Sequence, residues 1–342
     1  MGAPLIELTD DGLFCRAGGF HIDPWRGVDR AVVTHAHSDH ARWGSRTYLA
    51  AAPGEKLLRT RLGEITLDTL TYGEAVEHNG VRVSFHPAGH VLGSAQVRVE
   101  HGGEVWVVSG DYKLDPDPTC EPFEPVRCHT FLTESTFGLP IYRWEPSDVL
   151  FGQVNRWWRA NRDAGKASIV YAYSLGKAQR VMAGVDASIG PIYTHGAVEK
   201  VTQAYRDSGA SLPPTTPVGD AARGGKKAWA GALVIAPPSA DGSPWARKFE
   251  PASAAVASGW MTVRGARRRR AVDRGFVLSD HADWPGLLTA IRETGAERVL
   301  ATHGFAAVLA RWVRDHGLAA DVVATRYGDE DELATSAEVT PA

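Results

Sequence analysis

Residues 35–40 of this 342-residue chain read His35-Ala36-His37-Ser38-Asp39-His40, which places three imidazoles and a carboxylate within six residues. Neighbouring side chains of an extended segment point in opposite directions, but a tight turn allows all four to converge. Imidazole nitrogen and carboxylate oxygen are ligands that Zn²⁺ and Mn²⁺ accept. Two such cations side by side lower the pKa of a shared water toward neutrality. The stretch therefore predicts a metal site; the alternative is a histidine-rich surface turn.

The same arrangement, an apolar strand followed by a polar candidate residue, recurs along the chain. Layered α/β folds commonly place their sites at strand ends, so we expect these candidates to meet. The predicted strands and the candidates that follow or end them are 28–34 with the 35–40 stretch, 81–85 with His90, 104–109 with Asp111, 130–134 with Glu134, 275–278 with His281, and 298–302 with His303.

A site for two metals needs about seven protein ligands, one of them bridging, and an open position for water. Five histidines and two aspartates supply that number: His35, His37, His40, His90, His303, Asp39 and Asp111. Glu134 and His281 are then left over as a carboxylate–imidazole pair. Such a pair fixes the tautomer of the ring and raises its pKa, which suits a general acid.

Length and patterning predict two domains. Near residue 140 the pattern changes to alternating helices and strands, with helices at 147–161 and 175–187 among them, which is typical of a parallel sheet. We therefore expect a domain inserted at 142–265 within a discontinuous domain of residues 1–141 and 266–327. Residues 328–342 read as an acidic, mobile tail. His101-Gly102-Gly103 predicts a hairpin turn between strands 95–99 and 104–109.

Composition is that of a globular protein, with 44% hydrophobic residues and a net charge of −3. No apolar run approaches membrane-spanning length, and the first residues, MGAPLIELTDDG, do not resemble a signal peptide. Three scattered cysteines argue against a disulfide framework and a CxxC zinc site, so we expect a cytoplasmic protein and no membrane partner. Two basic blocks, Arg223 to Lys227 and Arg264 to Arg270, read equally well as solvated loops or nucleic-acid contacts.

With these residues assembled, the chain resembles the metallo-β-lactamase superfamily and, within it, the nucleic-acid-processing β-CASP branch. The 35–40 stretch matches the HxHxDH motif, and Asp23 stands where the first motif has a structural aspartate near the metals. The other matches are Pro87 to His90 and Ser109 to Asp111 for motifs three and four, Thr133 to Thr136 for motif A, Ser279 to Asp283 for motif B, and Thr302 to Gly304 for motif C. The motifs cover nearly the whole chain in the expected order.

The resemblance is narrower still to bacterial ligase-associated DNA exonucleases, through stretches such as AGHVLGSAQV, SGDYK and TESTFGLP. It implies an αββα metallo-β-lactamase sandwich with an inserted β-CASP α/β domain. It also implies a DNA exonuclease that acts on single-stranded ends in DNA repair, in functional association with a DNA ligase and a helicase. His303 at motif C is instead typical of RNA processors, so an RNA 3′-end processing endo- or exonuclease is the alternative.

The resemblance also implies roles for the candidate residues. His35, His37 and His90 would bind one Zn or Mn ion, while Asp39, His40 and His303 would bind the second. Asp111 would bridge the two ions, between which a hydroxide would attack the phosphorus. His281, held by Glu134, would contact the scissile phosphate or act as general acid. Asp39, Asp111, Glu134 and His281 are thus the predicted catalytic residues.

The inserted domain would form a lid that favours a single strand over a duplex. Ser174 and Lys177 lie at the predicted start of a lid helix, where they could seat a substrate phosphate. Capping of that helix by Ser174 is the alternative. Two further functions are less well supported than a nuclease. A small-molecule hydrolase of the lactonase or thioesterase kind would not need an insertion of this size. A catalytically dead scaffold would have lost metal ligands, whereas none of the candidate ligands is missing from this sequence.

Overall fold

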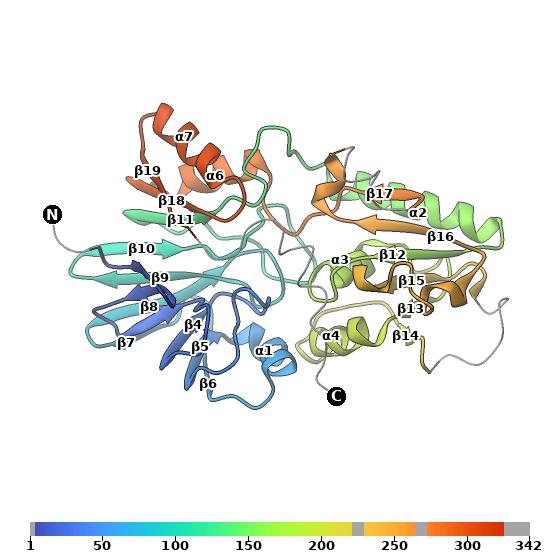
Figure 1. Ribbon diagram of the computed structural model, residues 1–342, viewed down its shortest axis with the longest axis horizontal. Helices are drawn as coiled ribbons and strands as arrows, with labels where there is room; N and C mark the ends of the chain where they lie inside the picture. Colours follow the sequence, from blue (N-terminus) through green and yellow to red (C-terminus); the bar gives the residue numbers. More distant parts are fainter. Residues whose placement is uncertain (1–3, 221–228, 264–271, 325–342) are drawn as a thin grey trace. The chain divides into compact units, whose positions relative to one another are not determined.

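The computed structural model describes residues 4–220, 229–263 and 272–324 (Figure 1). By their contacts, the residues divide into two compact units, each described by itself below. The first unit combines Met1–Arg143 with the segment from His281 onward, and the second runs from Trp144 to Asp280. Both predicted basic blocks and the predicted acidic tail lie outside the described residues. Within the described ranges, the helices are too short or too polar to cross a membrane.

The first unit contains two sheets. The first has six strands in the order β1-β2-β3-β4-β5-β6. Their bounds are Glu7–Thr9 (β1), Gly12–Cys15 (β2), Phe20–Ile22 (β3), Arg30–Val33 (β4), Thr47–Ala51 (β5) and Leu67–Leu70 (β6). A 3-10 turn, η1 (Ala52–Gly54), and helix α1 (Glu55–Leu62) connect β5 to β6.

The second sheet has seven strands in the order β19-β18-β11-β10-β9-β8-β7. Their bounds are Ala75–His78 (β7), Val81–Pro87 (β8), Ala95–His101 (β9), Glu104–Val108 (β10), Thr130–Glu134 (β11), Arg298–Thr302 (β18) and Ala319–Val322 (β19). The predicted hairpin of β9 and β10 is confirmed, and Gly102 and Gly103 take the positive φ that its tight turn needs. Strand β18 pairs with β11 in parallel, so Glu134 lies opposite Thr302.

One hydrophobic core joins these two sheets, because Ile22 and Val32 from the first pack with Val97 and Trp106 from the second. The other face of the second sheet is covered by α6 (Trp284–Thr294) and α7 (Ala306–Asp315), whose apolar sides bury residues such as Leu287 and Leu309 against Phe131. Figure 1 shows both helices on the side of β11 and β18 that faces away from β1–β6. This packing of helices on two stacked sheets is the core of the predicted sandwich.

The second unit is built on one parallel sheet in the order β14-β13-β15-β12-β16-β17. The strand bounds are Ala167–Tyr171 (β12), Ile192–Thr194 (β13), Thr216–Pro217 (β14), Leu233–Ala236 (β15), Ala252–Ala257 (β16) and Arg274–Phe276 (β17). The helices are α2 (Ser147–Asp163), α3 (Lys177–Gly184) and α4 (Gly196–Asp207), with 3-10 turns η3 (Pro238–Ala240), η4 (Ala246–Phe249) and η5 (Gly259–Thr262). The predicted alternation of helices and parallel strands is therefore present.

Two details of this unit differ from the sequence-based expectation. Strand β17 pairs with β16, so residues 274–276 belong to the second unit rather than to the first, where a boundary at 265/266 would place them. Helix α3 begins at Lys177 because Gly176 is its N-cap and the Gln179 side chain accepts the Gly176 N–H. Ser174 therefore does not cap this helix.

Candidate metal centre

The 35–40 stretch follows β4, whose buried end anchors it in the first unit. The backbone N–H groups of His40 and Ala41 both donate to the carbonyl of His37, which closes a tight turn. The turn directs the side chains of His35, His37, Asp39 and His40 toward one region, as the sequence predicted.

One cluster of ligand atoms gathers three histidines around Asp111. His37 Nδ1 lies 3.1 Å from His35 Nε2 and 3.0 Å from His90 Nε2. Asp111 Oδ2 lies 3.4 Å from His35 Nε2 and 3.7 Å from His90 Nε2. Residues 88–94 bring His90 here, since the Lys113 N–H donates to the Ala88 carbonyl and ties that loop to the segment after Asp111.

A second cluster consists of Asp39, His40 and again Asp111. His40 Nε2 lies 3.5 Å from Asp39 Oδ2 and 3.4 Å from Asp111 Oδ2. The same oxygen of Asp111 therefore faces both clusters. Gly110 makes this approach possible, because a Cβ there would lie 2.7 Å from the Thr34 side chain.

These clusters have the geometry and chemistry of divalent-cation sites. Tetrahedral coordination with bonds of about 2.0–2.1 Å places neighbouring ligand atoms roughly 3.3 Å apart, close to the observed 3.0–3.7 Å spacings. His40 Nε2 is buried and makes no hydrogen bond within the described part of the chain. This is expected of a nitrogen atom that binds a cation. The residues thus fit two metal ions, and imidazole with carboxylate suits Zn or Mn.

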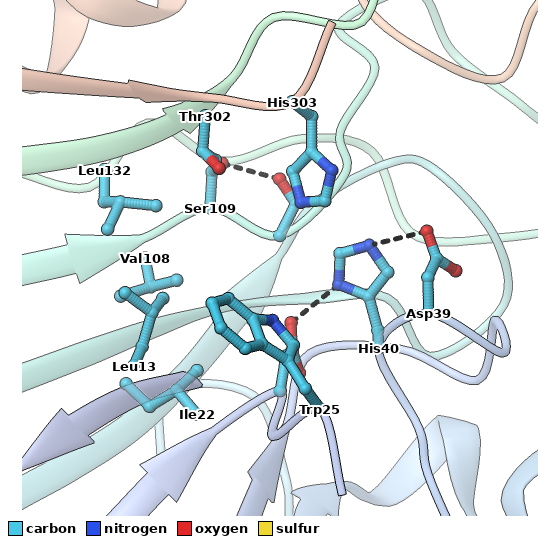
Figure 2. Close-up of a pocket in the computed structure, with 12 residues that line it drawn as sticks. Leu13, Ile22, Trp25, Asp39, His40, Val108, Ser109, Leu132, Thr302 and His303 are labelled. Atoms are coloured by element: carbon cyan, nitrogen blue, oxygen red, sulfur yellow. Dashed lines mark hydrogen bonds and ion pairs between the residues drawn. The ribbon is translucent and has the colours of Figure 1, made fainter. Parts of the chain in front are cut away.

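His303 lies at the edge of this arrangement. Its ring centroid is 5.5 Å from that of His40, and its ligand atoms are in neither cluster. His303 has a φ of 57°, in the left-handed region that non-glycine residues rarely adopt. Figure 2 shows His303, His40 and Asp39 gathered at one end of a pocket whose opposite wall is apolar. The role of His303 as a ligand of the second metal stays a prediction.

Asp23 supports the centre from behind the ligands. Its carboxylate accepts hydrogen bonds from the Thr34 N–H (2.8 Å) and the Thr34 hydroxyl (2.6 Å), and it lies 2.7 Å from His40 Nδ1. A carboxylate on the far nitrogen orients a metal-binding imidazole and raises its basicity. Asp23 also has a positive φ of 46°, a strained backbone conformation for a residue other than glycine, and this conformation places its carboxylate beside His40.

Glu134 and His281 form the predicted carboxylate–imidazole pair within the same unit. His281 Nδ1 lies 2.9 Å from Glu134 Oε2, and both side chains are buried. The Tyr112 N–H donates to the other oxygen, Glu134 Oε1, at 2.7 Å. This second hydrogen bond fixes the carboxylate. The His281 ring lies 4.7 Å from that of His90, beside the metal ligands.

Ser135 is a supporting residue that was not among the predicted site residues. Its hydroxyl lies within hydrogen-bond distance of the carbonyls of Thr302 (2.8 Å) and His303, and its own carbonyl accepts the Phe305 N–H. Ser135 thereby holds the strained turn that presents His303. The one available signal was its place directly after Glu134 in motif A.

Burial and neighbouring charges shift the pKa values of the clustered groups. Burial lowers the pKa of His35 well below its usual value, and the charge of His40 adds to this. Burial also acts to lower the pKa of His40, but Asp111, Asp39 and Asp23 together raise it well above normal. Burial acts to raise the pKa of Asp111, but His40 and His281 bring it well below normal. The carboxylate at the centre is therefore ionised and faces a concentration of nitrogen ligands.

The two predicted phosphate contacts lie in the second unit. Lys177 is buried, and its Nζ lies 3.0 Å from Asp280 Oδ1 and 4.7 Å from the centroid of the Tyr173 ring. Ser174 precedes α3, and its carbonyl accepts a hydrogen bond from Gln179 Nε2. The ammonium of Lys177 thus already has a partner, and a substrate phosphate there stays a prediction.

The sequence of this chain is similar to parts of several known proteins. The chain is 30% identical over 333 residues to a probable DNA ligase from Opitutus terrae, covering 96% of this chain and 32% of that protein. It is 27% identical over 168 residues to Endoribonuclease YSH1 of Yarrowia lipolytica, covering 46% and 20%. It is 30% identical over 227 residues to Transcription termination factor FttA of Pyrococcus abyssi, covering 52% and 34%. The chain thus spans about a third or less of the length of these relatives.

A solved structure of a protein of unknown function from Enterococcus faecalis V583 shares the fold, with a TM-score of 0.58 and 11% identity over 87% of this chain and 79% of that one. No family model matches the chain.

Two stacked sheets and a cluster of histidines and aspartates at their strand ends accompany these relatives. The chain is homologous to proteins of the β-CASP branch of the metallo-β-lactamase superfamily. Within that branch, almost its whole length is similar to part of a probable DNA ligase, and the predicted resemblance is confirmed.

Proposed function

We propose that this chain is a metal-dependent phosphodiesterase that degrades DNA from single-stranded ends during DNA repair. The observation that carries the proposal is the position of Asp111 Oδ2, which lies within 3.4–3.7 Å of His35, His40 and His90 and so faces two adjoining ligand clusters. A carboxylate shared in this way is what a dinuclear hydrolytic centre needs. DNA is favoured because the probable DNA ligase matches nearly the whole chain.

Two divalent ions bound here would lower the pKa of a water molecule and offset the charge that develops on the phosphate oxygens. The side chains of the protein would orient the ligands and transfer the proton. Asp23 holds the His40 ring through Nδ1, so its Nε2 points toward the ligand cluster. Glu134 accepts from His281 Nδ1, which leaves Nε2 to carry a proton to the leaving oxygen.

A substrate panel tests this function. The purified chain is incubated with single-stranded DNA, duplex DNA and single-stranded RNA, each labelled at either end, with Zn²⁺, Mn²⁺ or Mg²⁺. We expect stepwise shortening of single-stranded DNA that a chelator stops and added metal restores. Cleavage of none of these substrates with any metal would overturn the proposal.

An RNA-processing nuclease of the same fold is the second candidate. It is favoured by His303 at motif C and by the match to Endoribonuclease YSH1, a protein named for cleavage within RNA. The same panel separates the two functions, because internal cleavage of RNA with no shortening of DNA would select this candidate.

A functional association with a DNA ligase belongs to the proposal, since the chain matches about a third of a probable DNA ligase. We expect the chain to increase ligation of DNA ends that carry unpaired single-stranded flaps. The measurement compares the yield of ligated product with the wild-type chain and with an Asp111→Asn variant. Equal yields would remove the ligase from the proposal.

A further inference from the structure

Trp43 is the most exposed large hydrophobic side chain of the described residues, at 74% of its full accessible area. Single exposed hydrophobic residues are common and need no explanation by themselves. Trp43, however, stands three residues after His40. Because consecutive Cα atoms are about 3.8 Å apart, its Cα lies at most about 11 Å from that of His40. A strand of a few nucleotides is therefore long enough to extend from the candidate metal centre to this indole.

The loop that carries Trp43 is held firmly on both sides. The hydroxyl of buried Tyr48 donates to the Arg42 carbonyl at 2.7 Å and accepts from the Ser45 N–H at 2.9 Å. The Tyr48 side chain thereby links the backbone before Trp43 to the backbone after it. Exposure of this indole is therefore a property of a fixed turn, so stacking a flat ligand on it costs little ordering of the loop.

A second loop, residues 24–28, is locked against this one. The Val28 N–H donates to the Ser45 hydroxyl at 3.2 Å, and the Arg46 N–H donates to the Val28 carbonyl at 2.9 Å. Gly27 and Gly44 touch so closely that a Cβ on Gly27 would lie 2.4 Å from the Gly44 carbonyl oxygen. The two loops form one rim, which we call the tryptophan rim (residues 24–30 and 41–47).

The tryptophan rim borders the metal centre and is rich in cations. Trp25 lines the pocket that also contains Asp39, His40 and His303 (Figure 2). The rim contains four arginines and one aspartate: Arg26, Arg30, Arg42, Arg46 and Asp29. Arg46 is paired with Asp29, which lies 3.8 Å from Arg30, and Arg26 is paired with Asp11 outside the rim, so the rim keeps a net positive charge that is smaller than the number of its arginines. An exposed aromatic face among cations is the combination that binds single-stranded nucleic acid, since bases stack on the ring and phosphates meet the charges.

We propose that the tryptophan rim binds the single-stranded substrate and that Trp43 stacks on a base a few nucleotides from the phosphodiester to be cleaved. This inference rests on the proposed function and adds a substrate contact to it. Stacking on an aromatic side chain accepts any base, so Trp43 would favour unpaired strands without selecting a sequence. A duplex, whose bases are already stacked on one another, offers no such face except at its end.

The test uses the full chain with Trp43→Ala, Trp43→Phe and, as a matched control, Leu8→Ala, which removes another exposed side chain of the first unit (44%). We expect Trp43→Ala to raise KM for oligothymidylate roughly 5- to 150-fold, the range that the loss of one stacked base produces. Trp43→Phe should recover part of this loss, and Leu8→Ala should match the wild type.

Binding is also measured without catalysis, with metal-free protein and oligothymidylate. Quenching of tryptophan fluorescence should be smaller in Trp43→Phe than in the wild type, and an oligomer of abasic sugar-phosphate should bind wild type and Trp43→Ala alike. Equal affinity of wild type and Trp43→Ala for oligothymidylate would overturn this inference alone. A wild type that neither cleaves nor binds nucleic acid would overturn the proposed function and this inference with it.

Discussion

At the scale of single residues, the site is organised around one oxygen. Asp111 Oδ2 lies 3.4 Å from His35 Nε2 and 3.4 Å from His40 Nε2, in two different clusters. The carboxylate is buried and ionised, with its pKa held well below normal by His40 and His281 against the effect of burial. A buried charge of this kind is costly unless it is compensated, and cations bound in the proposed metal centre would add to the compensation that the histidines provide.

Replacing Asp111 with asparagine keeps the shape of this side chain and removes its charge. We expect the variant to bind at least one metal ion fewer and to cleave DNA at least about 100-fold more slowly, since Asp111 faces both ligand clusters and would help to hold a metal in each. Metal content by elemental analysis and the cleavage rate check this. Asp68→Asn, at an exposed position on β6, is the control. Full metal content and full activity in Asp111→Asn would contradict the assignment.

His281 and Glu134 support a different prediction, because the proposed function gives them a role in proton transfer rather than in metal binding. Glu134→Gln removes the charge that faces His281 Nδ1 at 2.9 Å. We expect kcat to fall roughly 100- to 10,000-fold, the usual range for loss of general acid catalysis, while the metal content stays at the wild-type level. A loss of metal together with activity would instead make Glu134 part of the metal centre.

At the scale of elements, parallel pairing of β11 and β18 brings together residues that are far apart in the sequence. Glu134 and Thr302 lie opposite each other at the ends of these strands. The next residues, Ser135 and His303, are then close enough for the Ser135 hydroxyl to hold the His303 carbonyl. The turn continues through Gly304, whose φ is 52° and whose neighbour is the Ser135 carbonyl. Motifs A and C are thus one structural feature.

Gly304→Ala tests this close approach. A Cβ at Gly304 would lie 2.4 Å from the Ser135 carbonyl oxygen, and that backbone atom cannot move aside cheaply. Gly102 is a matched control, because its φ of 58° is similar and no atom would lie within 4 Å of its Cβ. We expect Gly102→Ala to lower the free energy of unfolding by about 1 kcal/mol and Gly304→Ala by at least about 2 kcal/mol more. Equal losses in denaturant unfolding would show that crowding at Ser135 is unimportant.

At the scale of the whole molecule, each unit has its own hydrophobic core. The candidate metal ligands all belong to the first unit, whose cores bury Trp106 and Phe131. The second unit buries Trp158 and Met182 between its parallel sheet and its helices. Separate cores allow the stability of one unit to change without a direct effect on ligands in the other.

A pair of core variants checks this independence. Trp158 is fully buried and its indole N–H donates to the Gly231 carbonyl at 3.0 Å, so Trp158→Ala should destabilise the second unit by about 3–5 kcal/mol. We expect metal affinity to be unchanged in Trp158→Ala but reduced in Phe131→Ala, since Phe131 lies on β11 of the first unit. Unfolding curves and metal titrations of both variants provide the measurement. Equal effects on metal affinity would show one cooperative unit.

The proposed action on single-stranded ends also belongs to this scale. It predicts that single-stranded DNA is cleaved in preference to blunt duplex of the same sequence, because only an unpaired strand offers free bases for stacking. A comparison of the two kcat/KM values measures this preference. Equal values would contradict action on single-stranded ends.

Much of the first unit could be predicted from the sequence, because its signals are local. Alternating apolar residues predicted β8–β10, two glycines predicted the hairpin turn, and the spacing of the histidines predicted a turn that gathers them. Local periodicity could not show which sheet a short strand joins. Residues 275–278 therefore seemed to return to the first domain, whereas β17 pairs with β16.

The order of amino acids alone was enough to predict which imidazoles and carboxylates are candidate ligands, and that they follow buried strands. Only the tertiary structure shows which of these candidate side chains lie close together. The parallel pairing of β10, β11 and β18 sets Asp111, Glu134 and His303 at neighbouring strand ends, and Ser135, Thr34 and Tyr112 gain their roles only through that arrangement. The physical reason is that hydrogen bonds between strands join residues more than a hundred positions apart, which no local pattern in a sequence encodes.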